Sequence, residues 1–131
     1  MTALRFVCRA VGTVQIVLGA LYLLAPAAFL SWQGLSSANP DIAYPLAMLA
    51  ARFLVYGVGM FVIAGDPVRH RAFLDGMIAI QGIDLVAGLY LTAAGTIPLA
   101  VSGFPMFNAA AIIVMLVWLR PTGAYAPPAH A

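Results

Sequence analysis

Four apolar segments, each long enough to cross a lipid bilayer, constrain this chain more than any other feature. They run from Phe6 to Leu30, Ala43 to Ala64, Ala72 to Ala94 and Leu99 to Leu119. A helix crosses the hydrocarbon layer with about 20 apolar residues, and its backbone groups must be satisfied within the segment. The sequence therefore predicts an all-α fold, a membrane-spanning antiparallel four-helix bundle.

The composition excludes several other classes of protein. Hydrophobic residues make up 64% of the chain and charged residues 8%, whereas soluble domains are about 45–50% apolar and 25% charged. A net charge of +2 without a basic stripe and interleaved aromatic residues gives no reason to expect a nucleic-acid partner. The single cysteine, Cys8, excludes an internal disulfide and a cysteine-based metal cluster.

We expect one transmembrane domain over residues 1–120, followed by a short cytoplasmic tail over residues 121–131 that is rich in Pro and Ala. The first apolar segment has a basic start and an Ala25-Pro26-Ala27 pattern that is similar to a signal-peptide cleavage site. Its apolar run is too long for a signal peptide, so we expect an uncleaved anchor.

The arginine residues predict the orientation of the chain. They precede the first span, separate the second span from the third, and follow the fourth: Arg5, Arg9, Arg69, Arg71 and Arg120. The other two connections contain no Arg or Lys. The positive-inside rule then places both termini in the cytoplasm of a multi-pass protein. We expect the membrane to be a bacterial inner membrane.

Two charged residues fall inside the spans, Arg52 in the second and Asp84 in the third. Each lies about 12 residues, or roughly 18 Å, from the cytoplasmic end of its span. An arginine at the centre of a membrane helix costs about 2.5–3.5 kcal/mol on insertion scales. Because the two residues lie at equal depth on neighbouring helices, we expect them to form an intramembrane ion pair.

Each span also carries a stripe at spacings of three and four that contains small or polar residues. The stripes are Cys8, Gly12, Gln15, Gly19 and Tyr22; Met48, Arg52, Tyr56 and Gly59; Met77, Gln81, Asp84 and Gly88; and Phe104, Asn108, Ala111 and Met115. Such residues pack helices closely and form hydrogen bonds between them. We therefore expect a left-handed bundle with crossing angles of about +20°. Its candidate binding residues, which would meet near the middle, are Gln15, Arg52, Tyr56, Gln81, Asp84 and Asn108.

This polar layer has two interpretations. A paired Arg and Asp with amide support could serve only to fix the register and rotation of the helices. Alternatively, a pocket with Met, Phe and Tyr walls around that pair could hold a quinone head group, a lipid or another small amphiphile. A proton relay is the less favoured idea, because the chain contains no Glu and an aspartate paired with arginine is not free to shuttle protons.

Arg69, His70 and Arg71 form a compact cationic cluster between the second and third spans. It could contact anionic lipid head groups or an acidic partner, or it could act only as a topology signal. The second histidine, His130, lies in the tail, so no metal site is expected. No cofactor is expected either.

The sequence has no G-x-S-x-G, P-loop or H-E-x-x-H motif, so we expect no catalytic residues. The absence of such motifs and the short connections favour a non-catalytic accessory or assembly subunit of a larger membrane complex. Its partners would be membrane lipids and other membrane protein subunits. The alternative is a binder or transporter of a quinone, lipid or other amphiphile that uses the Arg52–Asp84 layer.

Three stretches carry a resemblance to a known family: VLGALYLLAPAAFLSW (17–32), AARFLVYGVG (50–59) and DPVRHRAFLDGMIAIQGIDLVAGL (66–89). In their order and pattern, they resemble small bacterial four-helix membrane proteins of the DoxX-like type. The resemblance implies a four-helix membrane fold. Some relatives are associated with quinone-coupled oxidation of sulfur compounds, but the resemblance assigns no catalytic residue to this chain.

Overall fold

The computed structural model describes residues 1–36 and 40–122, so all but the first two residues of the expected cytoplasmic tail lie outside the described part. The helices are α1 (Thr2–Leu24), α2 (Pro26–Trp32), a 3-10 turn η1 (Pro40–Ile42), α3 (Ala43–Gly65), α4 (Arg71–Ala93) and α5 (Leu99–Leu119). The described residues contain no strand, which confirms the all-α fold. Helices α1, α3, α4 and α5 are long and apolar enough to cross a membrane. The chain is a multi-pass membrane protein.

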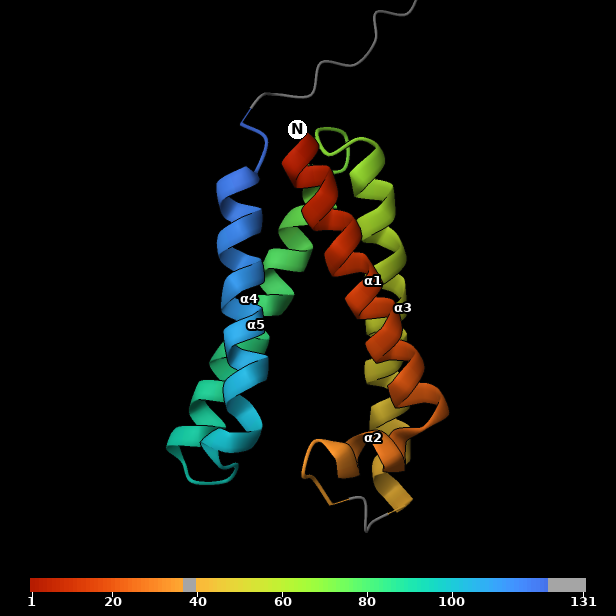
Figure 1. Ribbon diagram of the computed structural model, residues 1–131, viewed down its shortest axis with the longest axis vertical. Helices are drawn as coiled ribbons and strands as arrows, with labels where there is room; N and C mark the ends of the chain where they lie inside the picture. The colour runs from red at the N-terminus through yellow and green to blue at the C-terminus, as the bar shows by residue number, and fades with distance from the viewer. Residues whose placement is uncertain (37–39, 123–131) are drawn as a thin grey trace, which may run out of the picture.

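The first span does not continue to Leu30 as predicted, because α1 ends at Leu24 and a separate helix, α2, begins at Pro26. Ala25, between them, leaves the helical region with φ −140° and ψ 50°. A residue that precedes proline is disfavoured in the helical conformation, whereas proline fits the first turn of the next helix. The chain therefore turns at the end far from the N-terminus, where α2 lies (Figure 1).

The four long helices form two pairs. Helix α1 packs chiefly against α3, which we call the first pair, and α4 packs chiefly against α5, the second pair. The pairs converge at the end that holds the N-terminus and diverge toward the opposite end (Figure 1). The bundle is therefore closed over one half of its length only, whereas the sequence led us to expect closure around its middle.

A cluster of buried side chains from all four long helices holds the converging end together. Its members are Leu4, Cys8, Val11, Met60, Ile63, Ala64, Leu74, Met77, Ile112 and Leu116. The start of α1, the connection between α3 and α4 and the end of α5 lie at this same end (Figure 1). The first turns of α1 carry Arg5 and Arg9. The arginine-rich connections thus gather at the closed end, as expected for antiparallel neighbours.

The predicted stripes hold to different degrees. In α1, Cys8, Gly12, Gln15 and Gly19 are buried, as predicted. In α5 the predicted stripe is wrong by one residue: the buried positions are Ser102, Ala109, Ile112 and Leu116, and Phe104 is 77% exposed. In α3, Met48 is 59% exposed, so its place in the stripe was also wrong. Helix α5 is apolar on every side, so apolar periodicity could not identify its buried face.

Candidate functional site

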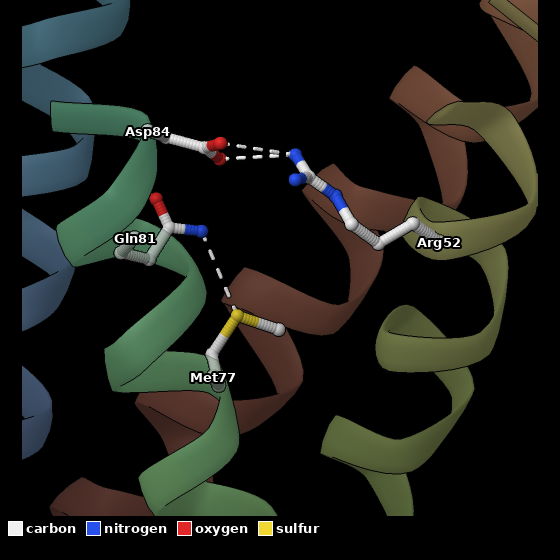
Figure 2. Close-up of polar contacts among 4 residues, drawn as sticks. All are labelled: Arg52, Met77, Gln81 and Asp84. Carbon is white, nitrogen blue, oxygen red and sulfur yellow. Dashed lines mark hydrogen bonds and ion pairs between the residues drawn. The ribbon is translucent and has the colours of Figure 1, made fainter. Parts of the chain in front are cut away.

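Arg52 of α3 and Asp84 of α4 form the predicted ion pair across the gap between the two helix pairs. The Arg52 Nη2 atom donates to both carboxylate oxygens of Asp84, at 3.2 Å from Oδ1 and 3.0 Å from Oδ2 (Figure 2). The two side chains are 33% and 35% exposed. The pair therefore neutralises both charges without being sealed inside the bundle.

The hydrogen bonding of this pair is incomplete. A fork-shaped Arg–carboxylate contact uses two nitrogens for two oxygens, whereas here one nitrogen serves both oxygens. The Nε atom of Arg52 is buried and has no hydrogen-bond partner in the described part of the chain. The Phe53 ring, whose centroid is 5.3 Å from Arg52 Cζ, provides a cation–π contact. Arg52 thus keeps donor capacity that the protein itself does not use.

A cleft of about 720 Å³ lies between the two helix pairs, and the ion pair forms part of its lining. The lining residues come from α1, α2, α3, α4, α5 and the connections beside α2 and α5. Most of the lining residues are apolar, including Leu18, Leu21 and Met106. The cleft therefore combines apolar walls with a charged pair, and it occupies the half of the molecule where the helices diverge.

Two buried amide side chains lie near the ion pair. Gln15 of α1 and Gln81 of α4 are each 4% exposed, and both line the cleft. Gln81 and Asp84 point from α4 toward α3, and the Gln81 Nε2 atom donates to the sulfur of Met77 at 3.6 Å (Figure 2). Thioether sulfur is a weak acceptor. No hydrogen bond joins the Gln15 side chain to another residue within 1–36 and 40–122.

An aromatic wall, consisting of Tyr22, Phe29, Trp32 and Phe53, lines another part of the cleft. Tyr22 meets the Phe29 ring edge to face at a centroid distance of 4.8 Å and stacks on Phe53 at 5.8 Å. The Tyr22 hydroxyl also donates to Oε1 of Gln33 at 3.3 Å. Such contacts between rings restrict side-chain motion, so this wall is a preformed surface.

Of the six candidate binding residues, the structure brings five to the cleft: Gln15, Arg52, Gln81, Asp84 and Asn108. Tyr56 is not among the lining residues. Tyr56 packs against the buried cluster of the closed end, and the centroid of its ring lies 4.7 Å from the centroid of the Phe73 ring. Tyr56 follows Arg52 by one helical turn, which takes it from the open half into the closed half.

The sequence reasoning expected Met, Phe and Tyr walls and included Tyr22 in a stripe, but it did not identify the other members of the aromatic wall. Phe53 was missed because it directly follows Arg52 and so lies off the three-and-four stripe of its helix. Phe29 and Trp32 reach the cleft because the chain turns at Ala25, which places α2 across the open end. The Ala25-Pro26 dipeptide was the signal that could have revealed this, had it been interpreted as a helix boundary rather than as part of a cleavage-site pattern.

The cationic cluster at the α3–α4 connection lies away from the cleft. Arg69 is exposed, and His70 and Arg71 are half-buried. The Asp66 carboxylate accepts a hydrogen bond from the Arg69 backbone N–H at 3.1 Å, which stabilises the turn. A contact of this cluster with lipid head groups or an acidic partner stays a prediction.

A second ion pair, between Asp75 of α4 and Arg120 at the end of α5, was not predicted. It joins the two helices of the second pair near the closed end. The hydrogen bond between the two side chains spans 45 residues of the sequence.

Comparisons with protein-family models, curated proteins and solved structures found no match to this chain. Functional inference therefore depends on the geometry of the cleft and its ion pair.

Proposed function

We propose that this membrane protein binds a small amphiphile, such as a lipid or a quinone, in the cleft between its two helix pairs. The observation that carries the proposal is the cleft itself, about 720 Å³ in volume, with the Arg52–Asp84 pair in its lining. Ligand sites have volumes of roughly 300–1,000 Å³, mostly apolar walls and a few polar groups that orient the ligand. The resemblance to DoxX-like proteins points in the same direction.

The hydrogen bonding of the lining is compatible with a ligand role. A buried donor or acceptor left without a partner costs about 1–3 kcal/mol. The Nε of Arg52 is such a group within the described residues, as is the Nε of Arg120 in the other ion pair. Only Arg52 lines this cleft, so a hydrogen-bonding occupant of the cleft would offset the cost at Arg52.

Filling the cleft with bulky side chains should abolish ligand retention. Leu18 and Ala100 both line the cleft, from α1 and α5. We expect the Leu18→Trp/Ala100→Trp double variant to lose bound amphiphile by roughly tenfold or more, which corresponds to about 1.4 kcal/mol of binding free energy. The measurement is mass spectrometry of small molecules that stay bound after gentle extraction of the protein.

The matched control is Val17→Trp/Ala87→Trp, which places the same bulk at exposed positions outside the cleft lining on α1 and α4. It should retain the amphiphile at the wild-type level. Equal retention by the plugged and the control variants, or no small molecule on the wild-type protein beyond the surrounding lipid, would refute the binding role.

A non-catalytic accessory or assembly subunit is the second candidate. Helix α4 favours it, since only 17% of its most apolar stretch is buried inside the protein. Ile83, Val86 and Tyr90 are among its exposed residues. In the same extraction, another membrane protein held in a fixed ratio would support this role, and a stable lone monomer would count against it.

The arginine distribution further supports an orientation with both termini in the cytoplasm of a bacterial inner membrane. In a Cys8→Ser background, we expect a cysteine at Thr96, in the exposed turn between α4 and α5, to react with a membrane-impermeant maleimide in intact cells. A cysteine at Val68, in the α3–α4 connection, should react only after the cells are permeabilised. The reverse pattern of labelling would show that the chain has the opposite orientation.

A further inference from the structure

The lining of the cleft is electrically neutral. Among the described residues that line it, only Arg52 and Asp84 carry formal charges, and these are opposite in sign and paired. The other polar groups of the lining include the uncharged amides of Gln15, Gln81 and Asn108. A ligand with a charged head would therefore bring a net charge into the membrane interior, whereas an uncharged head would leave the cleft neutral.

The unused hydrogen-bonding groups of Arg52 are donors. The guanidinium has five N–H groups and no acceptor, yet the hydrogen bonds it makes to the described residues all come from Nη2. The Nε atom is buried without a partner there, and Nη1 has no hydrogen bond in the same part of the chain. The Gln15 amide has no hydrogen bond in that part either, and it offers both a donor and an acceptor. Arg52 can only donate, so its missing partner is a group with acceptor oxygens.

An anionic head would satisfy these donors, but it would also compete with Asp84 for one guanidinium and bring a second negative charge beside that carboxylate. Moving one uncompensated charge to the membrane centre weakens binding by roughly a hundredfold. A carbonyl or ester oxygen accepts from Arg52 without this penalty, and it leaves the Asp84 contact intact.

We propose that the cleft selects an uncharged amphiphile whose head presents carbonyl or ester oxygens to the Nε and Nη1 atoms of Arg52 and to Gln15. The apolar remainder of such a molecule lies along Leu18, Leu21 and Met106, which line the cleft. This inference depends on the proposed binding function and goes further by naming the chemistry of the head group.

Three probes with an 18-carbon chain separate the possibilities. Monooleoylglycerol is uncharged and carries an ester, oleyl sulfate is anionic at every working pH, and 1-octadecene has no polar head. Binding is measured on protein in phosphatidylcholine nanodiscs, with empty nanodiscs subtracted. We expect monooleoylglycerol to bind at least about tenfold more tightly than either of the other probes.

The Arg52→Lys variant tests the recognising atoms. Lysine keeps a cation beside Asp84 but lacks the Nε donor and the planar guanidinium. We expect monooleoylglycerol affinity to fall about tenfold while the melting temperature stays near that of wild type. Gln15→Leu should weaken binding in the same direction, and Arg69→Lys, in the exposed connection, should leave it unchanged.

The outcomes separate this inference from the proposed function. If oleyl sulfate bound more tightly than monooleoylglycerol, the uncharged-head inference would be overturned but amphiphile binding would stand. Octadecene binding as tightly as monooleoylglycerol would have the same consequence. Unchanged affinity in Arg52→Lys would overturn the assignment of the recognising atoms. No binding of any probe above that of empty nanodiscs would overturn both the inference and the proposed function.

Discussion

Replacing either member of the Arg52–Asp84 pair alone should destabilise the protein more than replacing both. Arg52→Met leaves an unpaired carboxylate in the membrane interior, and Asp84→Asn leaves an unpaired guanidinium. Breaking a buried pair costs about 3–5 kcal/mol. Since these side chains are one-third exposed, screening reduces the cost, and we expect each single variant to lose about 2 kcal/mol of unfolding free energy.

The double variant Arg52→Met/Asp84→Asn carries no unpaired charge, so it should be more stable than either single variant, with a coupling energy of about 1–3 kcal/mol. Unfolding titrations in mixed micelles provide the measurement. The control cycle uses Arg120→Met and Asp75→Asn, an ion pair that lies at the ends of its spans, one turn into α4 and just after α5, rather than in their middle. We expect a smaller coupling there, about 0.2–1 kcal/mol. Additive losses in the Arg52–Asp84 cycle would contradict the role assigned to that pair.

Enlarging Gly57 should separate α1 from α3. A Cβ atom on Gly57 would lie 2.7 Å from Ile16 Cγ1 and 3.0 Å from both the Ile16 backbone N and the Gly12 carbonyl oxygen. Two of these atoms belong to the backbone of α1, so a rotamer change cannot relieve the overlap. Overpacking costs about 1–3 kcal/mol when the surroundings can adjust. We therefore expect Gly57→Leu to lose about 3 kcal/mol or more of unfolding free energy in the same titrations.

Gly82 of α4 provides the control for this substitution. A Cβ atom there would meet no other atom within 4 Å. Gly82→Leu should therefore be neutral, or gain up to about 1 kcal/mol from the higher helix propensity of leucine. If Gly57→Leu proved as stable as Gly82→Leu, the close approach of α1 and α3 would be wrong.

The two features that the sequence predicted best are the long helices and the ion pair, and both follow from the bilayer as a solvent. The hydrocarbon layer requires continuous apolar helices. The predicted spans that begin at Ala43 and at Leu99 therefore end within one residue of the observed ends of α3 and α5. The same solvent penalises an isolated charge, so equal depth was enough to pair Arg52 with Asp84.

The features that could not be predicted depend on packing between helices. Helix α1 packs chiefly against α3, with a close approach at Gly12 and Gly57, and α4 packs chiefly against α5. All four spans carry similar stripes, so the sequence pattern did not specify which helices would pair or that the two pairs would diverge. In α5 every face is apolar, so the buried side could be assigned only from tertiary contacts. Tyr56 was placed with the binding residues because a regular stripe was extended across the boundary between the open and closed halves.

Photocrosslinking tests the occupied cleft most directly, using a monooleoylglycerol analogue with a diazirine beside its ester and the protein in phosphatidylcholine nanodiscs. If the cleft binds the head group as proposed, crosslinks will map to Gln15, Arg52 and Phe53, and excess monooleoylglycerol will remove them. Crosslinks confined to outward-facing residues such as Val58 and Val86, with none that the competitor displaces, would show that the cleft holds no such ligand.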